Sequence, residues 1–477
     1  MSLQSRIQVA GQDGTEVEAG QESGKPALER TSVVSDPFAD LKTRVHKDII
    51  ARLGPRLFNA DAGTGDGDLE ATVNEAVTEV LALEKTPLTR QERQDIIRQI
   101  SDDILGYGPL EPFLRDDSIT EIMVNDHSTI YIERHGKITR TNAQFVDDQH
   151  LLRIIDKIIS RIGRRIDESS PYVDARLPDG SRVNAIIPPL AVRGSALTIR
   201  KFRRDPFTMP DLIKFGTLTH KSGQFLEACV RGKLNILISG GTGSGKTTTL
   251  NVLSSAIPSD ERIITVEDAA ELQLKQEHVI TLESRPSNIE GKGQVTIRDL
   301  VRNTLRMRPD RIIVGECRGP ETVDMLQAMN TGHDGSLTTI HANTPRDAMS
   351  RVETLVLTAG VDLPLRAIRE QSSAAFDLIV QVSRLVDGSR RITHITEVLR
   401  MESEVVTMQD IFSAKPVEDT EETAHAGNRL LGPLLSTGIK PQFLHKLSSN
   451  GVKLPNQFFQ LEQERQAQST AFRRQAS

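Results

Sequence analysis

Residues 240–250 read GGTGSGKTTTL and match the phosphate-binding pattern G-x-x-x-x-G-K-[ST] at every required position. Glycines in such a loop let the backbone turn tightly, so that successive N–H groups point at an anion. Lys246 is expected to reach the β- and γ-phosphates of a nucleotide, and the hydroxyl of Thr247 is expected to join the coordination shell of Mg²⁺. The segment therefore predicts a loop that binds nucleotide phosphates.

The two flanks of this loop have the patterns that such a motif requires. Residues 235–239 form an apolar run that predicts a buried strand, and residues 248–256 predict a helix whose positive N-terminal end faces the phosphates. A glycine-rich turn that contains a lysine by chance is the alternative, and the order of strand, loop and helix disfavours it. The predicted nucleotide-binding residues are Gly240, Gly241, Thr242, Gly243, Ser244, Gly245, Lys246, Thr247 and Thr248.

The 477 residues are too many for one ordinary core, and the sequence pattern changes along the chain. Residues 1–36 are rich in Gly, Ser, Gln and Glu and carry few large apolar side chains, so we expect a disordered tail there. The other predicted segments are a helical N-terminal region (37–101), an α+β domain (102–204), a proline-containing linker (205–215), an α/β domain (216–407) and a C-terminal extension without a catalytic role (408–477).

Periodicity within these segments predicts individual elements. Helical spacing of apolar residues marks 37–53, 69–83, 90–105 and 149–161. Short strands are predicted at 119–125, 129–136, 137–141, 172–177, 182–187 and 196–202. Alternating strands and helices in the α/β domain imply a mostly parallel sheet with helices on both faces. Ligands of such sheets lie at the carboxyl ends of the strands, where the phosphate-binding loop falls.

Composition limits the partners and the compartment. The formal net charge of -6 and the pI near 6.1 argue against a surface built mainly for nucleic acid. Cys229 and Cys317 are far apart and lack a C-x-x-C partner, which argues against disulfides and a zinc cluster and favours the cytoplasm. No apolar run is long enough to predict a transmembrane segment, so we expect other proteins to bring the chain to a membrane.

Two acidic positions follow apolar strands downstream of the loop. Residues 262–268 end in Glu267 and Asp268, and residues 311–316 end in Glu316. Cleavage of a γ-phosphate requires charge neutralisation and an oriented water. We predict Glu316 as the general base or water-orienting residue near the metal, and Glu267 as a residue that polarises water or positions the magnesium shell. The alternative is that both are strand-end carboxylates that face solvent.

Residues 331–343 place His333 and His341 around another short strand. A zinc site would require further ligands near by, and none has suitable spacing. The two histidines are candidates to donate hydrogen bonds to phosphate or to the acidic residues, and structural histidines are the alternative.

Arginines of the upstream domain are candidates to stabilise transition-state charge. Most surface arginines are only solvated, which is the alternative for each of them. The candidates are Arg176 and Arg182 around a Pro-Asp-Gly turn, Arg200 and Arg203 before the linker, and Arg318 directly after the second acidic strand.

Taken in order, these motifs resemble those of secretion ATPases of the type II/type IV class, in particular the TadA/CpaF group that drives Flp-type (Tad) pili. The similarity runs from residue 105 to beyond residue 398. It comprises GYGPLE (106–111), EIMVN (121–125), DGSR (179–182), TIRKF (198–202), the phosphate loop, VED (266–268), VGE (314–316) and the histidine segment. The four-cysteine zinc module typical of type II secretion and type IVa pilus motors is missing from the sequence, which favours the TadA/CpaF group.

The resemblance implies a homo-hexameric ring in which an N-terminal domain and a RecA-like C-terminal domain hold ATP and Mg²⁺ between them. It also implies a cytoplasmic motor that acts at the inner membrane through platform proteins. By the same implication Glu267 and Glu316 serve hydrolysis, His333 and His341 are functional, and Arg182 and Arg200 are the favoured arginine fingers.

Three other functions remain open at this point. A conjugation-type secretion ATPase is the nearest, although the GYGPLEP segment fits it less well. A nucleic-acid motor with a RecA-like core is disfavoured by the acidic balance and the scarcity of aromatic side chains, and no direct contact with nucleic acid is expected. A scaffold that binds nucleotide without turnover would not require Lys246, Thr247 and Glu316 together.

Overall fold

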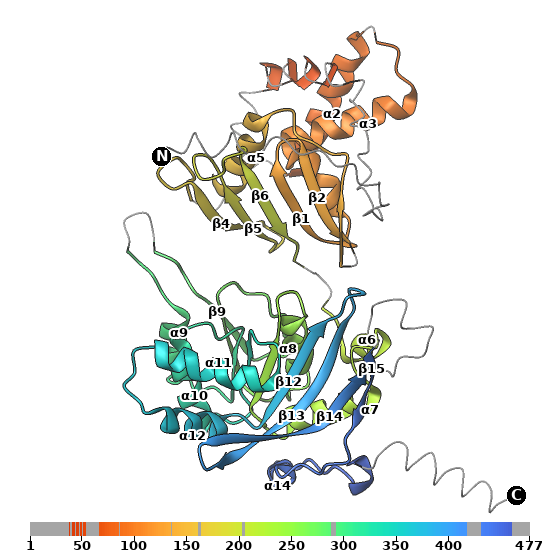
Figure 1. The fold of residues 1–477 in the computed structure, drawn as a ribbon. Coiled ribbons are helices and arrows are strands. Elements are labelled where there is room, and N and C mark those ends of the chain that lie inside the picture. Colours follow the sequence, from red (N-terminus) through yellow and green to blue (C-terminus); the bar gives the residue numbers. More distant parts are fainter. Residues whose placement is uncertain are drawn as a thin grey trace, which may run out of the picture. The chain divides into compact units, whose positions relative to one another are not determined.

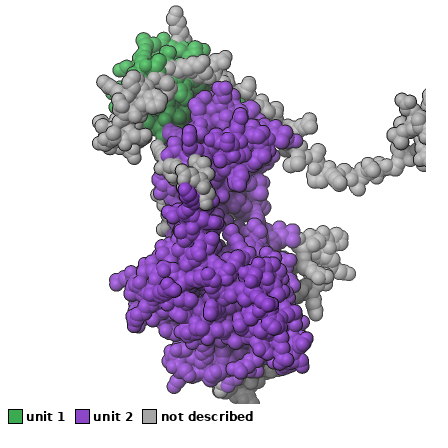
Figure 2. Space-filling view, turned by 90° about the vertical axis from the view of Figure 1, so that its left-hand side faces the viewer, with its two compact units in different colours: residues 1–111, 142–144 green, residues 112–141, 145–477 purple. Residues whose placement is uncertain are grey.

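The computed structural model describes residues 38–53 in part and then residues 66–84, 86–134, 136–160, 164–202, 206–287, 292–416 and 431–459. The predicted disordered tail, 1–36, lies outside these residues, as does Arg203. The chain forms two compact units, one of residues 1–111 with 142–144 and one of residues 112–141 with 145–477 (Figure 2).

The first unit is helical in its described residues. Its elements are α2 (Asp66–Leu83), α3 (Arg90–Leu105) and the short 3₁₀ helix η3 (Gly108–Leu110). Thr89 begins α3 with a capping box, because its hydroxyl accepts the backbone N–H of Glu92 and the Glu92 carboxylate accepts the N–H of Thr89. The buried residues of this unit lie on helical faces and form one core, which includes Leu41, Val45, Ile49, Val73, Val77, Ile96 and Ile100. The boundary predicted at residue 101 falls inside α3.

The first sheet of the second unit is antiparallel, and the described residues give it six strands in the order β3-β2-β1-β6-β5-β4. Its elements are β1 (Ile119–Asp126), β2 (Thr129–Arg134), β3 (Lys137–Arg140), α5 (Asp148–Ser160), β4 (Tyr172–Arg176), β5 (Arg182–Ile186) and β6 (Ala196–Arg200). Each predicted strand and helix of this region is present, with bounds within two residues of the expectation. Burial alternates along β5 and β6, so one face of the sheet supplies core residues and the other remains more exposed.

The second sheet has nine strands in the described residues, in the order β15-β14-β13-β12-β7-β11-β10-β8-β9. Figure 1 shows its strands β12, β13 and β14 side by side. The run from β12 to β9 is parallel, and β13, β14 and β15 add antiparallel strands at one edge. The strands are β7 (Ile236–Gly240), β8 (Ile263–Glu267), β9 (Val279–Glu283), β10 (Arg311–Val314), β11 (Leu337–Ile340), β12 (Leu378–Arg384), β13 (Arg390–Glu402), β14 (Val405–Pro416) and β15 (Leu431–Ser436). This parallel-rich sheet and the α+β region before it confirm the fold class predicted from the sequence.

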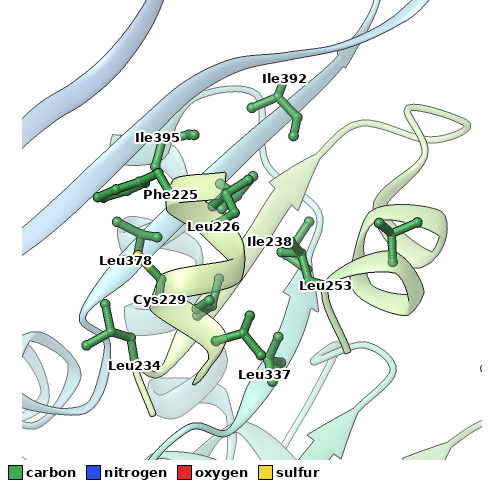
Figure 3. Packing of buried hydrophobic residues seen from close by; sticks show 14 of the residues in the cluster. Phe225, Leu226, Cys229, Leu234, Ile238, Leu253, Leu337, Leu378, Ile392 and Ile395 are labelled. Carbon is green, nitrogen blue, oxygen red and sulfur yellow. The ribbon is translucent and has the colours of Figure 1, made fainter. Parts of the chain in front are cut away.

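Helices accompany this sheet. They are α6 (Met209–Lys214), α7 (His220–Arg231), α8 (Lys246–Ser254), α9 (Ile297–Thr304), α10 (Glu321–Asn330), α11 (Pro345–Thr358), α12 (Leu365–Ala375) and α14 (Leu444–Ser449), with α4 (Glu111–Arg115) and η4 (Asn456–Phe459) elsewhere in the chain. The central strand β7 is buried on both faces of the sheet. Ile236 and Ile238 belong to the core on one face, and Leu237 belongs to the core on the other. Figure 3 shows the first of these cores, where Phe225 and Leu226 of α7 lie near Ile395 of β13.

Two further predicted boundaries differ from the structure. Residues 205–215 were expected to form a linker, but α6 begins at Met209 within them, and Thr208 and Asp211 form its capping box. The boundary expected at residue 408 falls inside β14, and the chain after it continues into β15 and α14. Leu447 and Phe459 are buried in the same core as Phe225, so the described part of 408–477 packs as part of the α/β domain. Leu447 and Phe459 lie more than 200 residues from Phe225 in the sequence, so no local pattern marks this packing.

Candidate active site

The phosphate-binding loop follows β7 and leads into α8, as its sequence requires. Gly243 and Gly245 have φ angles of 67° and 99°, in the left-handed region that L-residues with side chains rarely adopt. A Cβ at Gly240 would collide with the carbonyl oxygen of Val382 on the adjacent strand β12, so this position also requires glycine. The loop is therefore shaped by glycines at the three positions where a side chain is least tolerated.

Lys246 begins α8 and is 8% exposed. Its Nζ donates to the carbonyl oxygen of Gly241 at 3.0 Å and lies 3.3 Å from Nε2 of His341. Burial lowers the pKa of Lys246, the nearby Glu316 carboxylate opposes this effect, and Arg200 and Arg318 lower the pKa further. A buried ammonium with these neighbours is prepared to receive an anion such as a phosphate group.

Glu316 and His341 are brought together by the sheet. They follow β10 and β11, which are neighbouring parallel strands, so their carboxyl ends meet at one edge. Nε2 of His341 lies 2.9 Å from Oε1 of Glu316, and Nε of Arg318 donates to Oε2 of Glu316 at 2.6 Å. Burial and the Lys246 ammonium lower the pKa of His341, which favours the neutral imidazole beside Glu316.

Glu267 ends β8, the other neighbour of β10, and is 3% exposed. Its carboxylate accepts the backbone N–H of Glu271 at 2.9 Å and that of Leu272 at 3.2 Å. Burial raises the pKa of Glu267 to about 7, and the two backbone donors only partly offset this shift. A Cβ at Gly315 would stand 2.9 Å from Cγ of Glu267, so glycine before Glu316 makes room for this side chain.

Three of the candidate arginines come from the antiparallel sheet of the same unit. Nη1 of Arg182 donates to Oε1 of Glu271 at 2.9 Å. Nε of Arg200 lies 3.8 Å from Oε1 of Glu121. Arg176 pairs instead with Glu283 at 2.9 Å on the edge strand β9.

A cavity of about 450 Å³ collects these groups, a volume in the range of sites for small molecules. Predicted residues that line it are Thr242, Gly243, Gly245, Lys246, Thr247, Thr248, Glu267, Glu316, His341, Arg182, Arg200 and Arg318. Gly240, Gly241 and Ser244 do not line it: they shape the loop from behind, with Oγ of Ser244 donating to the carbonyl of Gly241 at 2.9 Å. The described residues contain no group of three or more His, Cys, Asp or Glu side chains that could hold a metal by themselves.

His333 is the predicted site residue that the structure leaves elsewhere. It precedes β11, whereas His341 follows that strand, so the two histidines lie at opposite ends of β11. Nδ1 of His333 contacts the carbonyl oxygen of Ala328 at the end of α10 at 3.3 Å, and the cavity lining does not include it. A position at the amino end of the strands does not support a role for His333 at the phosphates bound by the same chain.

Sequence reasoning also overlooked side chains at the loop. Arg384 and Arg390 stand at the two ends of the β12–β13 turn, and Nε of Arg390 donates to the carbonyl of Gly243 at 2.9 Å. No motif marks them. The pairing of β12 with β7 places this turn beside the loop, and long-range strand pairing of this kind is not visible in one sequence.

Fold and site together define a protein with a P-loop and a parallel-rich α/β core. Residues 103–472 match the family described as "Type II/IV secretion system protein", and the chain belongs to that family. This finding agrees with the resemblance seen in the sequence at the level of the family, and the TadA/CpaF subgroup stays a prediction.

Similar proteins carry secretion and conjugation names. The chain is 35% identical over 335 residues to a putative conjugal transfer protein of Mycobacterium tuberculosis, covering 69% of this chain and 95% of that protein. It is 33% identical over 318 residues to the type IV secretion system protein VirB11 of Brucella abortus, covering 61% and 87%. The crystal structure of the VirB11 ATPase of Brucella suis aligns with 30% identity and a TM-score of 0.33, covering 60% of this chain and 94% of that one.

No helix of the described residues is both long and apolar enough to cross a membrane.

Proposed function

We propose that this chain hydrolyses ATP and serves as the motor subunit of a secretion or pilus-assembly system. The observation that carries this proposal is the cavity in which the phosphate loop, Lys246, Glu316 and His341 meet at the carboxyl ends of parallel strands. Membership in the type II/IV secretion family supports the same activity. The glycine loop and the oxygen donors of Thr247 and Glu267 suit a nucleotide with its magnesium ion, which usually takes only one or two protein ligands besides phosphate.

Different residues of the cavity have different roles in the proposed hydrolysis of ATP. The loop N–H groups and Lys246 bind the phosphates, and Glu316 orients a water and accepts its proton. Arg318 holds Oε2 of Glu316, which leaves Oε1 for the water and His341. Mg²⁺, when bound, neutralises charge on the β- and γ-phosphates. We assign to Arg182 and Arg200, which line the same cavity, the stabilisation of charge that develops on the γ-phosphate.

Hydrolysis by the purified full-length protein tests this proposal. Lys246→Ala should abolish turnover and weaken ATP binding by at least about tenfold, whereas Glu316→Gln should bind ATP like the parent and lose about 100-fold or more in kcat. Glu277→Gln is the matched control, because Glu277 is an exposed acid of the same domain outside the cavity. Parent-like turnover by Glu316→Gln would remove Glu316 from the role of base, and a parent protein without any ATPase activity would refute the proposed function.

The same proposal includes an assembly and a location. We infer a homo-hexameric ring in the cytoplasm, held at the inner membrane by platform proteins, that powers assembly of Flp/Tad-type pili or related protein secretion. The ordered motifs from residue 106 to residue 341 support the TadA/CpaF group. Light scattering of Glu316→Gln with ATP tests the ring, and loss of pili in a strain that carries Lys246→Ala tests the system.

Conjugation-type secretion is a second candidate, and a specific observation favours it. The relatives from Mycobacterium tuberculosis and Rhizobium radiobacter are named as conjugal transfer proteins, with 35% and 34% identity. Loss of DNA transfer with intact pili in the Lys246→Ala strain would favour this candidate. Stimulation of turnover by added DNA would instead favour a motor that acts on nucleic acid directly.

A further inference from the structure

The β12–β13 turn lies beside the phosphate-binding loop because β12 pairs with β7. Val382 of β12 is in register with Gly240 of β7, so the residues that follow each of them leave the sheet at the same edge. Arg384 is the last residue of β12 and Arg390 is the first of β13. The short turn between them thus presents two guanidinium groups next to the loop.

Both arginines lie beside the part of the loop that requires glycine. Nε of Arg390 donates to the carbonyl oxygen of Gly243 at 2.9 Å. A Cβ atom added to Gly245 would lie 3.4 Å from Cδ of Arg390. A Cβ atom added to Gly243 would lie 3.4 Å from Nη1 of Arg384. Gly243 and Gly245 are the two residues of the loop with left-handed backbone angles. The two arginines therefore lie next to the peptides that only glycine can orient in this way.

The hydrogen bond from Arg390 has a consequence for anion binding. In a trans peptide the C=O and the following N–H point in opposite directions. A Gly243 carbonyl that is turned toward Arg390 therefore turns the N–H of Ser244 away from Arg390, where it contacts the carbonyl of Gly241 across the loop at 3.4 Å. Backbone N–H groups of such loops are the donors that bind phosphate, so the hydrogen bond from Arg390 sets the direction of one of them.

The same guanidinium also reaches the antiparallel sheet. Nη2 of Arg390 lies 3.6 Å from Oε1 of Glu133 on β2, whose side chain is 9% exposed. Oγ1 of Thr120 on β1 donates to this carboxylate oxygen at 3.2 Å, which fixes its position. Arg384 supports the contact, because its Nη2 donates to the carbonyl of Gly136 after β2 at 2.5 Å.

We propose that Arg390 is a positioning residue that orients the Gly243 peptide for phosphate binding and that Glu133 sets the position of Arg390. Nucleotide affinity is thereby linked to the antiparallel sheet, which supplies Glu133. This inference rests on the proposed function, because the ligand of the loop is taken to be ATP or ADP. Arg390 does not line the cavity and acts through the loop backbone.

Calorimetric titration of the full-length protein with ADP tests the role of Arg390. Arg390→Ala should bind ADP about tenfold more weakly, the effect of one lost hydrogen bond to a charged group. Arg391→Ala is the matched control: successive strand residues face opposite sides, and Nη1 of Arg391 donates to the carbonyl of Leu431 on β15 instead. Its affinity for ADP should equal that of the parent. Arg390→Lys keeps the charge without the planar donor group and should show a loss between these two.

A double-mutant cycle tests the link to Glu133. Glu133→Gln should weaken ADP binding about threefold in the parent and leave it unchanged in Arg390→Ala, because the coupling passes through the guanidinium. Equal effects of Glu133→Gln in both backgrounds would overturn the link, and parent-like binding by Arg390→Ala and Arg390→Lys would overturn the positioning role. Failure of the parent itself to bind ADP would instead refute the proposed function.

Discussion

Glu267 and Glu316 follow neighbouring strands, yet their surroundings differ. Oε2 of Glu316 accepts a hydrogen bond from Arg318, whereas among the described residues Glu267 forms no ion pair and accepts only backbone N–H groups. Burial without a cation is the reason that the pKa of Glu267 is raised to about 7. A carboxyl group with this pKa is half protonated near neutral pH until a cation reaches it.

The raised pKa of Glu267 predicts a pH dependence of stability in the protein without nucleotide or metal. The folded-state pKa lies above the ordinary value of 4.5, so the contribution to stability is complete below about pH 4.5 and is lost as the pH rises through about 7. Glu267→Gln retains an acceptor for the backbone donors and removes the titration. We expect this substitution to stabilise the protein by up to about 3 kcal/mol near pH 8 and to have little effect near pH 5.

Urea unfolding in EDTA at the two pH values measures this difference. Glu277→Gln serves as the control for a general change in net charge, because Glu277 is exposed. If Glu267→Gln shifted the unfolding midpoint equally at both pH values, the carboxyl group would already be ionised in the folded protein at the lower pH and the burial argument would fail.

Local spacing marked residues that the structure brings together in one cavity. The loop, Glu267, Glu316 and His341 each lie at or directly after the end of a predicted strand, and their roles stay predictions. Arg390 was not predicted because it is 147 residues from Gly243 in the sequence. It lies beside Gly243 because β12 pairs with β7. The sequence placed His333 at the phosphates, but its spacing from β11 does not reveal which end of that strand lies beside the loop.

At the scale of elements, a buried arginine connects β10 to the turn before β11. The Arg311 side chain at the start of β10 is fully buried and pairs with Glu261, while its Nη1 donates to the carbonyl of Gly335 at 3.1 Å. Gly335 has a φ of 84°, and a Cβ there would collide with Nη1 of Arg311. The turn and the strand therefore fit together only if residue 335 has no side chain.

Gly335→Ala is expected to destabilise the protein severely. The left-handed backbone alone costs about 1–2 kcal/mol for alanine. Displacement of the buried guanidinium from Glu261 adds about 3 kcal/mol or more. Gly332→Ala provides a matched control, because Gly332 has a φ of 100° and open space around its Cβ position, so only the backbone cost applies. Thermal unfolding of both variants should therefore give a much lower Tm for Gly335→Ala, and equal losses would show that Arg311 moves without penalty.

The elements themselves were more predictable than their partners. Periodicity located the strands of the antiparallel sheet because alternating burial is a local property of each strand. The order β7-β11-β10-β8 depends on crossovers that bring distant segments together, and a sequence pattern carries no record of them. The helix α6 was missed because two prolines near residue 208 indicated a linker, although Pro210 stands in the first turn of a helix, where proline is well tolerated.

At the scale of the whole molecule, the second unit supplies both walls of the cavity. The parallel sheet provides the loop and the acidic residues, and the antiparallel sheet provides Arg182 and Arg200. Arg182 is held by Glu271, whose backbone N–H in turn donates to Glu267. An arginine and a phosphate loop on one chain imply that each subunit of the proposed ring contains its own complete site.

This arrangement predicts the outcome of mixing two inactive variants. Lys246→Ala removes the phosphate-binding ammonium, and Arg182→Ala should lower kcat on the order of 10³-fold if Arg182 stabilises the transition state. Because both side chains line the cavity of one chain, rings co-assembled from the two variants should stay inactive, while rings of Lys246→Ala and the parent should keep part of their activity. The measurement is ATP turnover of co-expressed, differently tagged subunits purified through both tags. Recovery of turnover in the mixed variants would show that Arg182 completes the site of a neighbouring subunit, since only then could one intact loop meet one intact arginine.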